Sequence, residues 1–122
     1  MKVRIYNGSI RVRLGQSEVA DLVSKGALEE RLEFSSQTAL RYRIVTGGGG
    51  AGVTARFDGS RLEIAVSCDV LKDWAEGDEV SIHAEQDNGA GGLRILLEKD
   101  FACVHREGSA EDADTFPRPE DR

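Results

Sequence analysis

The sequence has few cysteines and no long apolar run. Two cysteines, Cys68 and Cys103, are fewer than the four or more that usually staple a small secreted domain. No apolar run approaches the roughly 20 residues that cross a bilayer, and the N-terminus alternates apolar and basic residues, unlike a signal peptide. We therefore expect a cytoplasmic protein with two reduced thiols and no membrane partner.

Acidic residues outnumber basic residues, which argues against general binding to nucleic acid. The net charge is −6, and phosphate neutralisation needs a basic surface. Residues 1–13 are the exception, because they hold four cations and no acid. Residues 107–122 hold six acids against two arginines, a composition that predicts a mostly extended or disordered tail. Within that tail, Phe116 is an aromatic that can dock on the domain or on a partner.

The length and composition indicate one soluble globular domain. A chain of 122 residues with 39% hydrophobic and 31% charged residues can bury a single modest core. We predict one β-rich domain over residues 1–106, followed by the acidic tail over residues 107–122.

The first half of the chain predicts two strand pairs around a short helix. Alternating runs at residues 2–6 and 10–14 flank "NGS", a strong hairpin signal because Asn and Gly tolerate positive φ. A helix over "GQSEVADLVSKGA" ends at Gly26, and strands follow at residues 28–34 and 38–45. The glycine-rich stretch 46–52 precedes a strand, which indicates a connection rather than a phosphate-binding loop.

The second half repeats this order. It contains a hairpin around Asp58, a helix from Ser67 to Gly77 with Trp74 in the core, and strands at residues 78–85 and 93–101. These elements align with those of the first half at shifts of 51 and 52 residues. Unrelated units can also look alike in this way. If the repeat is real, halves 1–46 and 52–100 interlock. We predict a β-dominated α+β fold of about eight strands and two short helices, forming a compact barrel or sandwich.

Two resemblances accompany these patterns. The segments "GSIRVRLGQSEVADL", "ILLEKDFAC" and "FPRP" resemble a family of small uncharacterised bacterial proteins, which implies no activity. In each half, the strand and helix that follow the turn also resemble the swapped-hairpin units of AbrB/MazE-like regulators. That second resemblance implies a homodimer placing Arg4, Arg11 and Arg13 of both copies on DNA, which the overall charge disfavours.

The arginines of the strands are the favoured binding residues. They alternate with the apolar residues, so on each strand they lie on the face opposite to the apolar side chains. If the strands are neighbours, these side chains and Tyr6 form one basic face that grips an anionic ligand or protein partner, extended by Lys99. The alternative is a solvated face balanced by glutamates. We favour a non-catalytic binding module, and its candidate residues are Arg4, Arg11, Arg13, Arg41, Arg43 and Lys99.

Cys103 and His105 carry the enzymatic alternative. In an extended segment, residues two apart point the same way, so this pair can supply two zinc ligands, with Cys68 and His83 as further donors. The same pair can act as a thiol nucleophile and its base. A half-buried cysteine followed by a solvated histidine is the simpler interpretation, and we favour it over catalysis.

Overall fold

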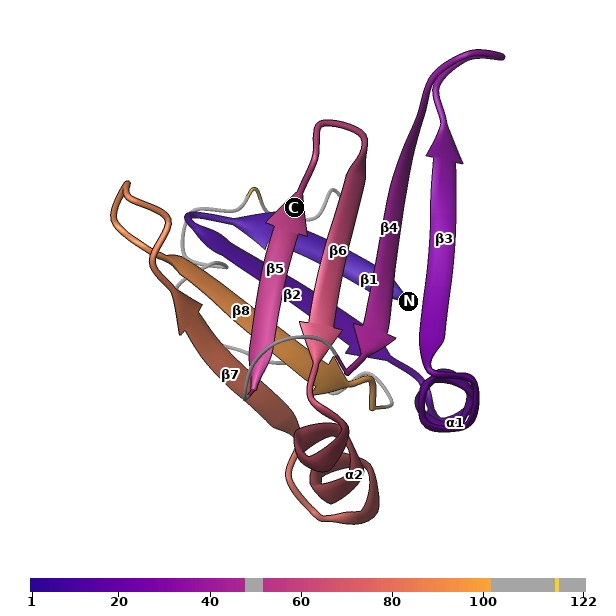
Figure 1. Cartoon of the computed structure of the whole chain (residues 1–122), viewed down its shortest axis with the longest axis vertical. Helices are drawn as coiled ribbons and strands as arrows, with labels where there is room; N and C mark the ends of the chain where they lie inside the picture. The colour runs from indigo at the N-terminus through magenta and orange to yellow at the C-terminus, as the bar shows by residue number, and fades with distance from the viewer. Residues whose placement is uncertain (48–51, 102–115, 117–122) are drawn as a thin grey trace.

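The computed structural model describes residues 1–47, 52–101 and 116 (Figure 1). These residues form eight strands and two helices. In chain order they are β1 (Lys2–Tyr6), β2 (Ser9–Leu14), α1 (Gln16–Lys25), β3 (Ala27–Glu33), β4 (Ala39–Thr46), β5 (Val53–Phe57), β6 (Arg61–Val66), α2 (Cys68–Glu76), β7 (Ser81–Gln86) and β8 (Leu93–Lys99).

The strands form two four-stranded mixed sheets that face each other with their strands crossing (Figure 1). Sheet A has the order β1-β2-β8-β7, and sheet B has the order β3-β4-β6-β5. Each sheet consists of two antiparallel hairpins joined by one parallel pairing, β2 with β8 in sheet A and β4 with β6 in sheet B. The predicted β-dominated α+β fold is confirmed, and the described strands form a sandwich rather than a closed barrel.

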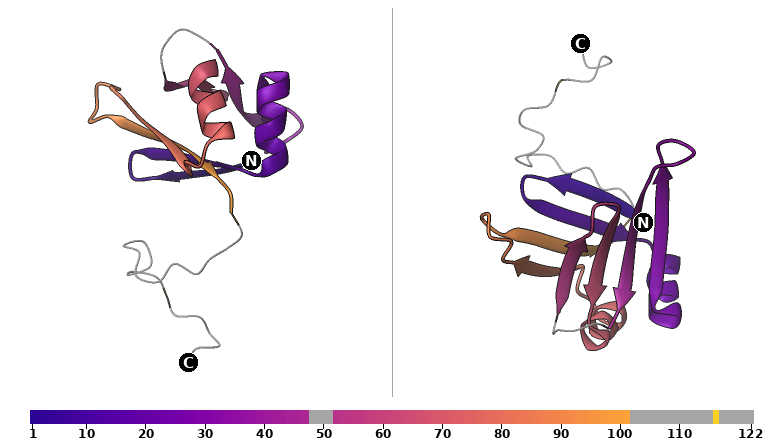
Figure 2. Two further views of the ribbon diagram at one scale, coloured as in Figure 1. Left: turned by 90° about the horizontal axis from the view of Figure 1, so that it is seen from below. Right: turned by 45° about the horizontal axis from the view of Figure 1, so that its top comes forward.

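Each sheet contains one hairpin from each half of the chain. Helix α1 carries the chain from β2 in sheet A to β3 in sheet B, and α2 carries it back from β6 to β7. The two halves of the chain have the same element order, β1-β2-α1-β3-β4 and β5-β6-α2-β7-β8. Replacing each strand by its counterpart in the other half turns the strand order of sheet A into that of sheet B. The two helices lie side by side at one end of the sandwich (Figure 2).

One apolar core lies between the sheets and under the helices. The central strands contribute most of it because every second residue of a strand faces the same side. Trp74 on α2 is buried as predicted, and its indole Nε1 donates to the carbonyl oxygen of Val80 at 3.1 Å. The buried core residues are Ile10, Val12, Leu14, Leu22, Ile44, Val53, Ala55, Ile64, Val66, Leu71, Trp74, Ile95 and Leu97.

Turn residues have the conformations that their chemistry favours. Asn7 and Gly8 have φ of 47° and 80° and form the tight β1–β2 turn. Gly26 ends α1 in the left-handed region at φ 82°, whereas Gly77 ends α2 in an extended conformation. Gly77 is required for another reason, since a Cβ there would lie 2.7 Å from the carbonyl oxygen of Asp73.

Several predictions concern residues beyond the described part of the chain. The domain boundary at residue 106 and the tail, apart from Phe116, lie outside the described residues, as do Cys103 and His105. Phe116 itself is 94% exposed. Over the described ranges, neither helix has the length and apolar character needed to cross a membrane.

Candidate functional site

The structure divides the candidate arginines between two faces. Arg4, Arg11 and Arg13 lie on β1 and β2 in sheet A, whereas Arg41 and Arg43 lie on β4 in sheet B. All five alternate with inward-facing apolar residues, as predicted, and therefore point away from the core. Because the core separates the two sheets, the outer faces point in opposite directions, and the prediction of one continuous basic face is wrong.

The outer face of sheet A is hollowed into a pocket of about 410 Å³, here called the arginine pocket. Three adjacent strands contribute its cations: Arg4 from β1, Arg11 from β2 and Arg94 from β8. Its lining consists of Arg4, Tyr6, Ser9, Arg11, His83, Ala84, Glu85, Arg94, Ile95 and Leu96.

Strand register brings these side chains together. Arg4 lies directly opposite Arg11, and Arg94 lies opposite Ser9, in the neighbouring parallel strand. Leu96 occupies the position between Arg11 on β2 and His83 on β7, which gives the pocket an apolar floor. The parallel pairing of β2 with β8 is therefore what adds Arg94 to the arginines of the first hairpin.

Polar and aromatic groups complete the pocket. The guanidinium carbon of Arg4 lies 5.6 Å from the centroid of the Tyr6 ring, a cation–π contact. Nη2 of Arg94 lies 3.4 Å from the carbonyl oxygen of Asn7, at the β1–β2 turn. Nε2 of His83 and the hydroxyl of Ser81 are 2.8 Å apart and share a hydrogen bond. The pocket thus presents several donors around an apolar floor.

Glu98 neutralises part of the positive charge beside the pocket. Its Oε1 lies 2.9 Å from Nε of Arg11 and 3.6 Å from Nε of Arg13, and the side chain is only 13% exposed. The N–H groups are not aligned for a hydrogen bond to this oxygen, so the contact is a pure ion pair. Arg13 is therefore tied to Glu98 beside the pocket and does not line it.

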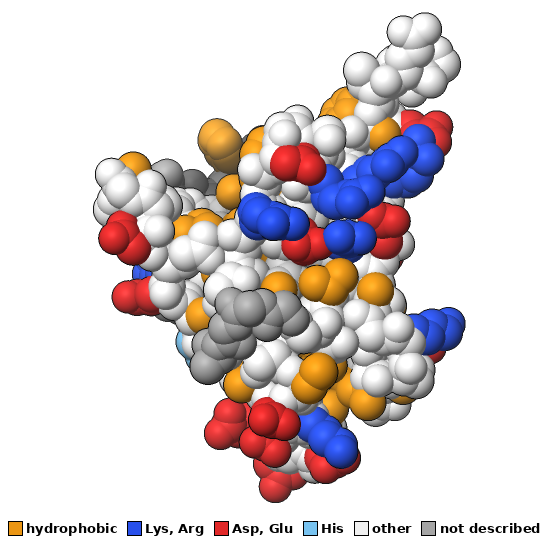
Figure 3. Space-filling model, viewed as in Figure 1, with side chains coloured by type: hydrophobic (Ala, Val, Ile, Leu, Met, Phe, Trp, Pro, Cys, Tyr) orange, Lys and Arg blue, Asp and Glu red, His pale blue; other side chains and the backbone are white. Residues whose placement is uncertain are grey.

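The outer face of sheet B carries a second group of arginines and glutamates (Figure 3). Arg43 donates to Glu63 from Nε at 2.8 Å, and Nη2 of Arg56 donates to the other oxygen of Glu63 at 3.1 Å. These contacts resemble the balanced, solvated face that was the alternative to a binding surface. Arg41, by contrast, is exposed.

Lys99 has a structural position. Its Nζ donates to the carbonyl oxygen of Gly77 at 2.9 Å and lies 5.6 Å from the centroid of the Trp74 ring. It pairs in register with Leu14 on β2, whose side chain is in the core, so it points to the face of sheet A opposite the arginine pocket. Lys99 therefore closes the C-terminal end of α2 and does not extend the pocket.

The proposed metal and thiol pair, Cys103 and His105, lies outside the described residues. Of the two further donors, Cys68 is exposed at the start of α2, and His83 lies on the outer face of sheet A. Within residues 1–47 and 52–101, no three histidine, cysteine or acidic side chains come together in a group suited to a metal ion.

Two pocket residues, Arg94 and His83, were not among the candidates. Both carry a signal in the sequence, since each occupies a polar position in an alternating strand. Their placement beside Arg4 and Arg11 depends on the pairing of β2 with β8, strands at opposite ends of the described domain. Alternation identifies which face of a strand a residue occupies but not which strand lies next to it.

The chain belongs to the DUF7009 family, a family of unknown function whose model matches residues 1–120. The resemblance to an uncharacterised family over the whole chain is confirmed at this level. No curated protein and no solved structure matches the chain. The local resemblance to AbrB/MazE-like units stays a prediction.

Proposed function

We propose that this protein is a non-catalytic binding module whose arginine pocket holds a small anionic ligand. The observation that carries the proposal is the convergence of Arg4, Arg11 and Arg94 on one hollow of about 410 Å³ in a chain of net charge −6. Guanidinium groups present planar forks of N–H donors that match phosphate and carboxylate oxygens. A cluster of them in an otherwise acidic protein therefore favours an anion.

The remaining lining supports a ligand with an organic part. Leu96 and the ring of Tyr6 provide apolar contact area, and Ser9 and His83 provide further polar contacts at the wall. The volume falls within the range of small-molecule sites, which is about 300–1,000 Å³. These features favour a phosphorylated or carboxylated small molecule over a bare inorganic ion.

The DNA-binding alternative is less well supported by this face. Arg4, Arg11 and Arg13 do lie together on the outer face of sheet A, as that alternative requires. Glu98, however, pairs with both Arg11 and Arg13, which reduces the charge available for phosphate groups of a duplex. A hollow with an apolar floor also suits a compact ligand better than a DNA backbone.

Calorimetric titration with pyrophosphate tests the proposal. Arg94→Gln is the most informative variant, because Arg94 is exposed and the one hydrogen bond of its side chain in the described structure is the long contact to the carbonyl oxygen of Asn7. We expect saturable binding to the wild-type chain and a dissociation constant higher by about tenfold in the variant, the effect of one charge-assisted hydrogen bond.

Two control variants each remove a cation that lies outside the pocket. Lys25→Gln removes a surface charge on α1 that pairs with Asp21, and Lys99→Met removes the amine at the end of α2. Both should leave the dissociation constant unchanged. Equal affinity of the wild type and Arg94→Gln, or equal losses in all three variants, would contradict binding in the pocket.

A further inference from the structure

Strand β3 is an outermost strand of sheet B, and no other described strand pairs with its free side (Figure 1). Its sequence is ALEERLE, and all of its residues except Leu28 are exposed. The strand contains no proline, so its backbone can accept a further strand along its whole length. An exposed edge of this kind is a template for pairing with another chain.

The pairing of β3 with β4 determines which backbone groups point to this edge. Just before β3, the N–H of Thr46 donates to the carbonyl oxygen of Gly26 at 3.0 Å. Just after β3, the N–H of Phe34 donates to the carbonyl oxygen of Thr38 at 2.9 Å. Because hydrogen-bonded pairs alternate with non-hydrogen-bonded pairs along an antiparallel ladder, the even-numbered residues of β3 bond to β4. The residues whose backbone N–H and C=O groups point to the free edge are therefore Ala27, Glu29, Arg31 and Glu33.

The charges of β3 are self-complementary about Glu30. An antiparallel second copy centred on this residue places Glu29 opposite Arg31 of the partner subunit, and by symmetry Arg31 opposite Glu29 of the partner subunit. Odd-numbered residues then pair with odd-numbered residues, so the free backbone groups of both copies meet and every side chain keeps its face of the sheet. Opposite charges that face each other across strands stabilise a sheet.

The core-side face of the same register brings apolar side chains together. Leu28 lies opposite Leu32 of the partner subunit, so Leu32, which is 52% exposed in the single chain, gains an apolar neighbour. Glu30 lies opposite its own copy at the two-fold axis and is the one like-charge pair of this register. The hydroxyl of Tyr42 donates to Glu30 at 3.0 Å, which disperses part of that charge.

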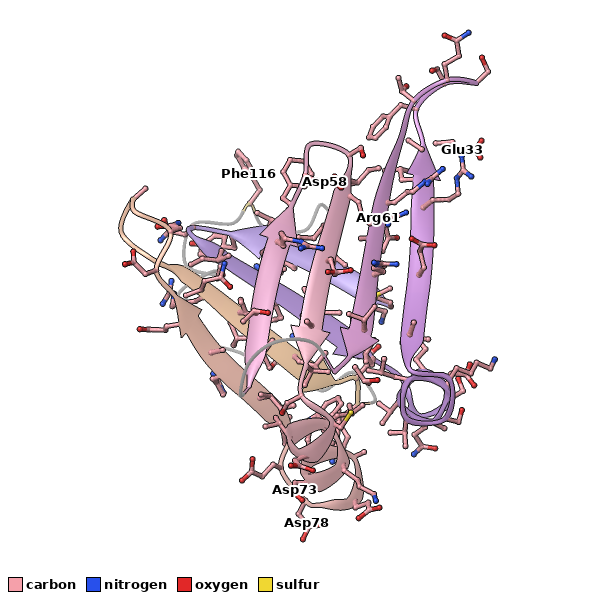
Figure 4. The ribbon with its side chains drawn as sticks, viewed as in Figure 1. Glu33, Asp58, Arg61, Asp73, Asp78 and Phe116 are labelled. Atoms are coloured by element: carbon pink, nitrogen blue, oxygen red, sulfur yellow. The ribbon has the colours of Figure 1, made fainter. Side chains whose placement is uncertain are left out.

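Glu29 and Arg31 have only weak ion pairs within the single chain. On the outer face of sheet B, Nε of Arg61 lies 3.7 Å from Glu29, and Nη2 of Arg31 lies 3.2 Å from Glu33 (Figure 4). Such exposed pairs contribute little, so they compete poorly with pairs across a new strand. Arg31 also lies opposite Arg41 on β4, and an acid on the other side of β3 would offset this repulsion.

The other edges of the two sheets are less suited to self-pairing. β5 and β7 are linked by Gln86, whose side chain bonds both backbone groups of Ala55. β1 carries Lys2 and Arg4 and no acid, so two copies of it would repel each other. β3 is the edge at which charges of both signs match those of its own copy.

We propose that β3 pairs in this antiparallel register with β3 of a second copy of the chain, joining the two B sheets into one continuous sheet across a two-fold axis. Main-chain hydrogen bonds supply the contact, and the facing charges of Glu29 and Arg31 fix its register. The contact is independent of the arginine pocket on sheet A.

Charge reversal in the full chain tests this proposal. In a homodimer, Glu29→Arg places two pairs of cations opposite each other, and Arg31→Glu places two pairs of anions. In sedimentation velocity, the wild type should dimerise with rising concentration. Each variant should dimerise at least about tenfold more weakly, because both symmetric contacts change sign. An equimolar mixture of the two variants should regain dimerisation, because the arginines of one copy then face the glutamates of the other.

Further measurements locate the contact at β3. Lys72→Glu, a charge reversal on α2, should leave dimerisation unchanged, and Glu30→Gln should strengthen it by removing the like-charge pair at the axis. Hydrogen exchange at the amides of Glu29 and Arg31 should slow with rising concentration, while exchange at β1 should not change. Circular dichroism checks that each variant is folded.

Three results would overturn the proposal. The first is a wild type that stays monomeric at every concentration, and the second is a mixture of the folded Glu29→Arg and Arg31→Glu chains that fails to dimerise. The third is amide exchange at β3 that does not depend on concentration in a protein that does dimerise, since the contact would then lie elsewhere.

Discussion

Glu98 determines how the individual arginines of sheet A divide their roles. Its carboxylate is mostly buried between Arg11 and Arg13, so removing either cation would leave a poorly solvated negative charge. A loss of anion binding in an Arg11 variant would therefore combine a local charge defect with loss of a ligand contact. Arg94 does not neutralise a buried carboxylate in the described structure, so a substitution there tests anion binding without a local charge defect.

At the scale of one residue, Asp58 fixes the turn that starts β6. Its Oδ1 accepts hydrogen bonds from the backbone N–H groups of Ser60 at 3.0 Å and Arg61 at 2.8 Å. These bonds, first that of Ser60 and then that of Arg61, lower the pKa of the Asp58 carboxyl. Figure 4 shows this turn at the upper end of sheet B, close to Arg61.

The lowered pKa predicts a specific pH dependence for Asp58→Asn. A folded-state pKa below the unfolded one adds stability above the unfolded value of about 4, and this stability is lost as the pH falls through the folded value. We expect the variant to be less stable than the wild type at neutral pH, with a difference that shrinks under acidic conditions. Urea denaturation across this pH range measures it, and a difference that stays constant with pH would refute the role of the charge.

At the scale of secondary-structure elements, local signals predict the hairpins and helices well. Asn7-Gly8 forms a turn with positive φ at both residues, and Gly26 ends α1, as its chemistry indicates. The parallel pairings leave no such signal, since β2 has the same alternation whether β8 runs parallel or antiparallel to it. The elements are therefore readable from the sequence, while their order in the sheets is not.

Gln86 links an element of each sheet. On β7 of sheet A, its side-chain amide accepts from the backbone N–H of Ala55 and donates to the carbonyl oxygen of Ala55, both at 2.8 Å. Ala55 belongs to β5, one of the two edge strands of sheet B. The amide thus satisfies both backbone groups of one edge residue and fastens that side of the sandwich.

Gln86→Ala is expected to lower the free energy of unfolding by about 1–3 kcal/mol, because both backbone groups of Ala55 lose their partner in a partly buried position. Chemical denaturation measures this loss. Gln37→Ala, in the exposed turn between β3 and β4, provides a matched control and should change stability little. Equal stabilities of the two variants would show that the link contributes nothing.

At the scale of the whole molecule, the sandwich explains why one predicted basic face became two. Alternation places Arg11 and Arg41 correctly on the outward side of their strands, but a sandwich has two outward sides. Each side draws strands from both halves of the chain, so nearness in sequence does not decide which residues share a face. Lys99 shows a related limit, since a strand-end lysine looks identical in sequence whether it faces solvent or caps a helix.

Anion binding in the arginine pocket is best tested by titrating the isotopically labelled full chain with pyrophosphate and recording ¹H–¹⁵N correlation spectra of the backbone and arginine side chains. We expect saturable shifts at Arg4, Arg11 and Arg94 and at the β2–β8 pairing around them, with a midpoint below that of any shift on sheet B. Small shifts that do not saturate and spread evenly over both sheets would contradict an anion site in the arginine pocket.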